Sequence, residues 1–440
     1  MGAFDLISRH RGLRVNLDQA SDNELRLQLD QLQNEYDKLK HTGLNLDLTR
    51  GKPCTAQVAL ADAMDGCLNG DFVSAEGIDV RNYGGLDGLL EAKQLFGSIL
   101  GVPEQHVLIG GNGSLTLMYQ TIQFALQVGI NGPNTAWEHG GPVKFLCPSP
   151  GYDRHFSICE HLGIELIAVP MLDTGPDMDI IENLVQQDSR IKGMWCVPRF
   201  SNPTGCVYND ETVKRIAKLA KLASDGFAVM WDNAYALHAL TAAAPSLASI
   251  SDYCEEYGTQ DSVFQFGSTS KMTFAGSGVC FMSSSEENIS AFKRHLEFQT
   301  IGPDKVNQLR HVKFLQDKQH AMQHMAKHAE IIAPRFACVL DTLNSELSGT
   351  GMAQWTKPEG GYFISFNSLP GLAKHIVKLA SDIGVKVTPA GATFPYGKDP
   401  TDSNIRLAPT YPSLQDVQAA MSAFVICVKL ASVEQALERS

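Results

Sequence analysis

The sequence predicts an α/β protein with a large domain built on a mainly parallel, seven-stranded sheet and a smaller α+β domain. At 440 residues the chain is too long for one ordinary hydrophobic core. From about Val107 onward, short apolar runs alternate with amphipathic helical stretches, which indicates a parallel sheet covered by helices. Near Pro303 this alternation gives way to a long helical stretch and a shorter α+β section.

The N-terminal forty residues predict a helix, because Ser21 and Glu24 form a capping box ahead of ELRLQLDQLQNEYDKLK. A short extended stretch at 44–48 and a turn at 50–53 follow. The expected strands of the large sheet are HVLIGG, VKFLCP, IELIAVP, GMWCVP, FAVMWD, VFQFGS and GVCFMSS. Helices such as SLTLMYQTIQFALQVG and DETVKRIAKLAKLAS lie between them.

The C-terminal part begins with a helix over residues 304–347, in which Pro334 is the only breaker. After it come GGYFISFN, a helix through HIVKLASDIG, then VKVTPA, NIRLAP and a final amphipathic helix. We therefore expect an N-terminal helical segment at 1–60 that packs with the small domain. We also expect a large domain at 61–305 and a small C-terminal domain at 306–440, entered by the long helix.

Composition restricts the partners and the location. The net charge of −12 argues against a nucleic-acid backbone or an anionic membrane as a partner. No run of eighteen apolar residues predicts a membrane span, and MGAFDLISRHRG has no apolar segment of a secretory signal. Ten cysteines without a C-x-x-C pair are typical of reduced, buried thiols. These features predict a cytoplasmic protein.

Three histidines, His320, His324 and His328, recur at every fourth residue of the expected long helix. Such spacing could form a metal-binding face. However, no carboxylate or cysteine nearby completes a ligand set, so we predict no metal and interpret the histidines as a solvated or interface stripe.

Several expected strands end in loops with distinctive motifs, and the carboxyl ends of parallel strands are where such sheets bind ligands. GGNGS at 110–114 opens a helix, whose free N–H groups could hold an anion. Tyr152, after VKFLCPSPG, could stack on a flat ring. Each motif also has a structural explanation, a strand–helix turn for the first and a half-buried turn tyrosine for the second.

Polar side chains follow three further strands. Asn202, in SNPTG, is an amide that can donate to a phenolate oxygen. Asp232 ends FAVMWD, where an acid needs a partner such as a pyridinium N–H, an ion pair or a helix cap, and Tyr235 lies three residues later. Lys271, in STSK after VFQFG, would be nucleophilic if its pKa were lowered, although such lysines are usually solvated. Together these loops indicate one functional site.

These motifs resemble those of the fold-type I, class I/II aminotransferases, which are pyridoxal-5′-phosphate (PLP) enzymes, over residues 44–409. The resemblance implies the PLP-dependent transferase fold, with Lys271 forming a Schiff base with PLP and moving the proton at the substrate Cα. It also implies that Asp232 pairs with the pyridine nitrogen, that Tyr235 and Asn202 bind the O3′ oxygen, and that Tyr152 stacks on the ring.

The same resemblance implies how the cofactor phosphate is held. The expected phosphate residues are Gly113, Ser114 and Leu115, helped by Ser268 and Ser270. Tyr83, in RNYGGLDG, resembles a tyrosine that reaches the phosphate of the neighbouring subunit, which implies a homodimer with shared active sites.

The substrate side of the expected site centres on Arg406, in NIRLAP. It matches the arginine that grips the substrate α-carboxylate, a task suited to a planar guanidinium. Asn202 and Gly51 complete the expected substrate-binding set.

In one respect the chain departs from the family, because residues 272–280 lack the arginine that usually binds the phosphate. The strings RGKP, TSKMTFAGSGV and NIRLAPTYPS resemble the bacterial type Ic aspartate aminotransferases.

The resemblance implies ping-pong transamination, with L-aspartate and 2-oxoglutarate giving oxaloacetate and L-glutamate. A second cation must then bind the distal carboxylate, and the sequence does not choose among Arg50, Arg154, Arg199 and Lys52. Alternatives are an aminotransferase of other specificity, or a β-lyase or decarboxylase on the same scaffold. A PLP-sensing regulatory domain is a further alternative, but the chain is acidic and only some forty residues precede the first motif.

Overall fold

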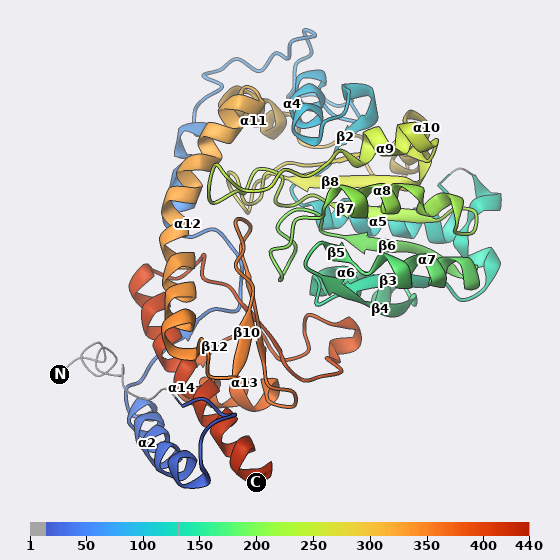
Figure 1. Cartoon of the computed structure of the whole chain (residues 1–440). Helices are drawn as coiled ribbons and strands as arrows, with labels where there is room; N and C mark the ends of the chain where they lie inside the picture. Colours follow the sequence, from blue (N-terminus) through green and yellow to red (C-terminus); the bar gives the residue numbers. More distant parts are fainter. Residues whose placement is uncertain (1–14, 131, 440) are drawn as a thin grey trace.

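The large domain is built on an eight-stranded sheet with the strand order β2-β9-β8-β7-β6-β3-β4-β5 (Figure 1). The computed structural model describes residues 15–130 and 132–439. The strands are β2 (Val107–Ile109), β3 (Lys144–Ser149), β4 (Glu165–Leu172), β5 (Gly175–Pro176), β6 (Ile191–Cys196), β7 (Ala228–Asp232), β8 (Val263–Ser268) and β9 (Cys280–Ser283). Strand β9 is antiparallel to β2 and β8, and β5 is antiparallel to β4, while the other pairs are parallel.

Each strand expected from the sequence is present, but the predicted number of seven is wrong by one. The additional strand, β5, has only two residues and returns along the end of β4. Two residues are too few for a periodic pattern, and the pair includes a proline, which is tolerated because this strand lies at the sheet edge.

Helices cover both faces of this sheet. The helices are α4 (Leu90–Leu100), α5 (Ser114–Gln127), α6 (Asp153–His161), α7 (Met178–Gln187), α8 (Asp210–Lys218), α9 (Ile250–Tyr257) and α10 (Glu286–Leu296). Neighbouring residues of β3 enter different cores: Phe145 packs with α5, α6 and α10, and Leu146 packs with α7, α8 and α9. Burial of both faces explains why the strands are apolar throughout.

The predicted single helix over 304–347 is wrong, because it consists of α11 (Lys305–Leu315) and α12 (Lys318–Leu347). The helix is interrupted at Gln316, which has a φ of 58°. The Asp317 carboxylate then caps α12 by accepting from the backbone N–H of His320. Pro334 lies inside α12. No strong sequence pattern signals a glutamine with a positive φ. In contrast, Pro334, which the sequence indicates as a helix breaker, is accommodated within α12.

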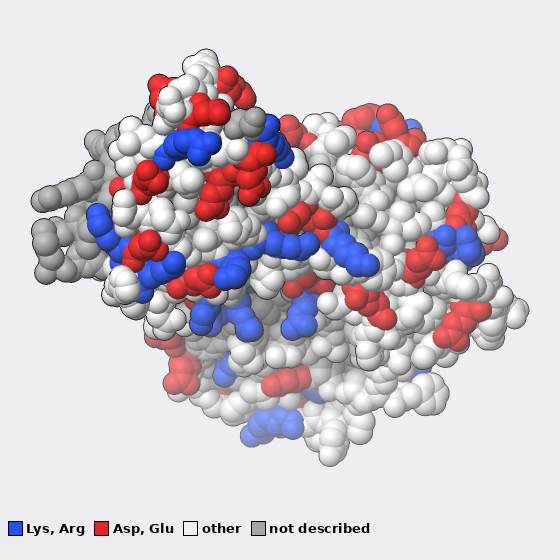
Figure 2. Space-filling view, turned by 90° about the horizontal axis from the view of Figure 1, so that it is seen from below, with Lys and Arg blue, Asp and Glu red and all other residues white. Residues whose placement is uncertain are grey.

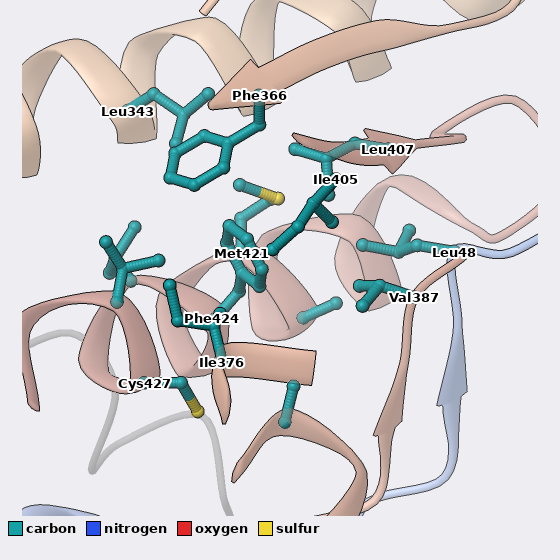
Figure 3. Packing of buried hydrophobic residues seen from close by; sticks show 14 of the residues in the cluster. Leu48, Leu343, Phe366, Ile376, Val387, Ile405, Leu407, Met421, Phe424 and Cys427 are labelled. Carbon is teal, nitrogen blue, oxygen red and sulfur yellow. The ribbon is translucent and has the colours of Figure 1, made fainter. Parts of the chain in front are cut away.

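The small domain contains two further sheets, one of β10 (Ala353–Trp355), β11 (Ile364–Ser368) and β13 (Asn404–Leu407), and one of β1 (Leu46–Asp47) and β12 (Val385–Lys386). The first is antiparallel, and the second is a parallel pair of segments far apart in sequence. Its remaining helices are α3 (Thr55–Ala59), α13 (Ala373–Asp382) and α14 (Leu414–Arg439). Figure 3 shows Phe366 of β11 and Met421 and Phe424 of α14 meeting in the core of this domain.

The predicted N-terminal helix is α2 (Asp22–Lys40), and its capping box between Ser21 and Glu24 is confirmed. Leu32 and Tyr36 of α2 pack in the small-domain core. This packing concerns the N-terminal segment alone, and the division of the chain at residues 60 and 305 stays a prediction. In contrast, α11 and the first turns of α12 pack with α4 of the large domain, and α12 enters the small-domain core only from Ile332 onward. Residues 1–14, on which the expectation about a secretory signal depends, lie outside the described residues.

The C-terminal helix α14 was expected to be amphipathic, and this is wrong. It is buried on all sides from Ala423 to Val433, and before that only Gln418 is exposed and Ser422 half-buried between Val417 and Ala423. By length and composition it could cross a membrane, but 83% of its most apolar eighteen-residue window is buried inside the protein. It packs against α2, α12 and α13, so it is the central helix of the small domain.

Candidate active site

A pocket lies where the loops after β3, β6, β7 and β8 meet. In Figure 1 the arrowheads of the parallel strands point toward α12 and the small domain, so these loops converge at one edge of the sheet. The pocket is lined by Gly51, Ser114, Leu115, Met118, Tyr152, Val197, Asn202, Asp232, Ala234, Tyr235, Ser268, Lys271 and Phe363. Segments predicted separately from the sequence therefore contribute to one cavity.

Lys271 follows β8 and lines the pocket. Its Nζ lies 5.1 Å from the centre of the Tyr235 ring. Burial lowers the pKa of Lys271, and the negative charge of Asp232 partly opposes this shift. The side chain therefore has the desolvated environment that makes a lysine amine nucleophilic.

Asp232 ends β7 with only 3% of its surface exposed. Its Oδ2 lies 2.9 Å from Nε2 of His155, whose ring stacks on Trp195 of β6 at a centroid distance of 4.1 Å. Its Oδ1 is buried and has no hydrogen-bond partner among the described residues. A buried carboxylate oxygen in this state is a strong acceptor for a donor that enters the pocket.

His155 was missed by the sequence analysis. It lies three residues after Tyr152 on α6, so both side chains lie on one helix face, and their rings meet edge to face at 4.9 Å. That spacing is a weak signal because many helical histidines lie near an aromatic residue. Only the fold brings His155 to Asp232, which is 77 residues away in the sequence.

The two tyrosines of the pocket are both protonated at neutral pH. Burial, together with the charge of Asp232, raises the pKa of Tyr152 to about 12, and burial raises the pKa of Tyr235 well above its usual value. Tyr152 stands at the start of α6, and Tyr235 follows β7. Both phenols therefore remain hydrogen-bond donors over the physiological range.

One end of the pocket is formed by the start of α5. Gly113 is the N-terminal cap residue of this helix, with Ser114 and Leu115 in its first turn. Ser268 lines the pocket, whereas the hydroxyl of Ser270 donates to the carbonyl of Asn112 at 3.2 Å. Among the described residues that line the pocket, Lys271 is the only cation. This end therefore offers helix N–H groups and hydroxyls, which suit an anion.

Arg406, on β13 of the small domain, is almost fully buried and lies beside the pocket, in contact with two of the residues that line it. Its guanidinium lies over the ring of Phe363 at 4.8 Å and donates to the Oδ1 atoms of Asp153 and Asn202. Gly51 is also placed here, and a Cβ at this position would lie 2.3 Å from the Phe363 ring. The glycine lets the aromatic ring approach the backbone.

Some predicted residues lie elsewhere. Tyr83 is 83% exposed and does not line the pocket of its own chain. Arg199 lines a separate groove beside α12, where its Nη1 donates to the carbonyl of Ala236 at 2.5 Å. Lys52 lies over the ring of Tyr411 at 3.8 Å. Arg50 and Arg154 are exposed next to pocket-lining residues.

The histidine stripe on α12 is only partly as predicted. His320 is exposed and pairs with Asp317, but His324 and His328 are buried, with their Nε2 atoms 3.1 Å apart. His324 also contacts the carbonyl of Met272, beside Lys271, at 2.7 Å. Within residues 15–130 and 132–439, no group of three histidine, cysteine or acidic side chains is arranged to hold a metal ion.

Residues 20–440 match the family model described as "Aspartate amino-transferase". The chain belongs to the aspartate aminotransferase family. Among relatives of this family, an aspartate aminotransferase of Corynebacterium glutamicum is 44% identical over 408 residues, which cover 92% of this chain and 94% of the relative. The crystal structure of an aspartate transaminase from the same species superposes with a TM-score of 0.93 at 42% identity, covering 96% of this chain and all of that one.

A more distant neighbour shows the fold alone: an α-aminoadipate aminotransferase from Thermus thermophilus, complexed with N-(5′-phosphopyridoxyl)-L-leucine, has a TM-score of 0.71 at 20% identity and covers 94% of this chain. The aspartate aminotransferase family uses PLP as its cofactor, and the pocket fits this group. Asp232 offers an unpartnered buried oxygen for a ring N–H, Lys271 an amine of lowered pKa, and α5 its N-terminus for a phosphate.

Proposed function

We propose that this aminotransferase moves the amino group of L-aspartate to 2-oxoglutarate, giving oxaloacetate and L-glutamate. The observation that carries the proposal is the pairing, in one pocket, of the amine of Lys271 with the unpartnered oxygen of Asp232, next to Arg406. When bound, PLP supplies an electron sink for the negative charge that develops at the substrate Cα. The 44% identity to an enzyme named for aspartate supports the choice of substrate.

The chain's own residues divide the work. Lys271 would hold the cofactor through Nζ and, when freed by the incoming amino acid, take the proton from the substrate Cα. Its lowered pKa favours the neutral amine that this step requires. Asp232 would accept from the ring nitrogen through Oδ1 while His155 holds Oδ2, so that the carboxylate cannot rotate away.

The remaining contacts position the cofactor and the substrate. Tyr235 and Asn202 would bind the O3′ oxygen, and Tyr152 would lie on the ring. Arg406 would bind the α-carboxylate. The phosphate would be bound by Gly113, Ser114, Leu115 and Ser268, which provide backbone and hydroxyl donors in place of the missing arginine. Ser270 would join them by giving up the hydrogen bond from its hydroxyl to the carbonyl of Asn112.

Tyr83 supports a homodimer with shared sites. It is exposed on a loop that adjoins residues 298–305, since Lys305 donates to the carbonyl of Gly84 at 2.5 Å. Phe298 and Ile301 of the adjoining loop are also strongly exposed.

We expect the protein to have twice its 47.9 kDa mass in solution, with Tyr83 of one subunit at the phosphate of the other. Tyr83→Phe should weaken PLP binding about tenfold, because one hydrogen bond to a charged group is lost. A protein that sediments as a monomer in analytical ultracentrifugation and is fully active in the transamination assay would contradict the homodimer with shared sites.

We also propose that the distal carboxylate is bound by Arg50 or Arg154. Arg199 lines another groove, and Lys52 lies over Tyr411. Replacing the correct arginine with alanine should raise the KM for aspartate about 10- to 100-fold, which corresponds to the loss of one charge-assisted contact. Turnover of alanine, which has no distal carboxylate, should change little. If neither variant alters the preference for aspartate over alanine, the assignment is wrong.

A cytoplasmic location without nucleic-acid or membrane partners fits the net charge of −12 and the ten free cysteines. On the face drawn in Figure 2, acidic and basic side chains are interspersed.

A steady-state assay with aspartate and 2-oxoglutarate tests the proposed reaction, and oxaloacetate and glutamate should form in equal amounts. Pyruvate and ammonia without glutamate would instead indicate a β-lyase on the same scaffold.

A further inference from the structure

Both hydrogens on one nitrogen of the Arg406 guanidinium are already donated within the protein. Nη1 donates to Oδ1 of Asp153 at 2.9 Å and to Oδ1 of Asn202 at 3.2 Å, and Nε approaches Oγ1 of Thr388 at 3.4 Å. A guanidinium binds a carboxylate best through two parallel N–H groups on different nitrogens. One of the present bonds must therefore break before Nη1 and Nη2 can grip a ligand in this way.

We propose that the carboxylate of Asp153 occupies the place of the substrate α-carboxylate on Arg406 in the free enzyme, and that the α-carboxylate of the incoming amino acid displaces it. This inference rests on the proposed role of Arg406 in substrate binding. It adds a residue that sets the apparent affinity for the substrate, without assigning that residue any contact with the reacting atoms.

Asp153, rather than Asn202, is the partner that can leave. Its side chain is 37% exposed, whereas Asn202 is 3% exposed. Asp153 is also the first residue of α6, so a change of its side-chain rotamer turns the carboxylate toward water without unwinding the helix. A displaced Asp153 regains hydration, whereas a displaced Asn202 would leave a buried amide without a partner.

Electrostatics favour exchange over simultaneous binding. Two carboxylates on the same Nη1 would lie a few ångströms apart and repel each other. When Asp153 leaves as the ligand arrives, the buried Arg406 exchanges one negative partner for another and is never left as an isolated buried charge. The pair also joins α6 of the large domain to β13 of the small domain, so that its opening transfers a contact between domains to the substrate.

The test measures binding of succinate, a dicarboxylate without an amino group, from the change in absorbance of the PLP-loaded enzyme. Asp153→Ala removes the competing carboxylate, and Asp153→Asn removes its charge with little change of shape. We expect the Kd of succinate and the KM of aspartate to fall about five- to tenfold in the alanine variant and by a smaller factor in the asparagine variant. The KM should change by a larger factor than kcat.

Glu160→Gln is the matched control, because it removes one exposed charge from the same helix and should leave the Kd unchanged. A Kd that rises in both Asp153 variants would mean that Asp153 orients Arg406 for the ligand, and an unchanged Kd would mean that it does not compete; either result overturns the inference while the proposed function stands. If succinate fails to bind the unmodified holoenzyme, the role of Arg406 is wrong, and the inference falls with it.

Discussion

Lys271→Ala should lower the rate of transamination by at least about 10³–10⁴, the contribution expected of a group that moves the proton in the transition state. The effect is large because Lys271 is the only amine among the described residues that line the pocket. Its environment also lowers its pKa, which a lysine at the surface would not share. Replacement removes both the covalent attachment point and the base.

Two measurements check this prediction beyond the rate. The unmodified enzyme should show an absorbance band of the bound cofactor that shifts when aspartate is added. Borohydride should fix the cofactor to the chain there but not in the variant. Lys378→Ala, which removes an exposed lysine paired with Asp382 on α13, is the control. Retention of borohydride-fixed cofactor in the Lys271 variant would show that another lysine carries it.

Asp232→Asn should lower kcat/KM by about 10²–10⁴. Asparagine keeps the shape of the side chain but removes the buried charge opposite the ring nitrogen, and breaking a buried charge pair costs about 3–5 kcal/mol, which corresponds to this factor in rate. The unpartnered Oδ1 is the atom that matters, because Oδ2 is already held by His155.

The loss in the Asp232 variant should appear in catalysis rather than in cofactor retention, since the phosphate contacts at α5 and the Lys271 linkage remain. Titration of the variant with PLP, followed by absorbance, separates the two effects. Asp261→Asn, which neutralises an exposed acid before β8, should behave like the unmodified enzyme. Normal turnover by the Asp232 variant would remove this carboxylate from the mechanism.

Much of the site was predictable because of one regularity of parallel sheets. Tyr152, Asn202, Asp232 and Lys271 follow strands whose apolar runs are visible in the sequence, and the carboxyl ends of parallel strands meet at one edge. The residue types at those ends then limited the chemistry. The same regularity predicted the large sheet, except for the two-residue strand β5.

By itself, then, the sequence determined the α/β class, the strands, the helix cap at Ser21 and the residue types at the strand ends, since these depend on local periodicity and short motifs. Only the tertiary structure decided the partners: His155 against Asp232, and Asp153 against Arg406, 253 residues apart. It also decided that α14 is enclosed and that Arg199 faces another groove. The physical reason is that such contacts depend on the packing of distant elements and on side-chain rotamers, which no local pattern encodes.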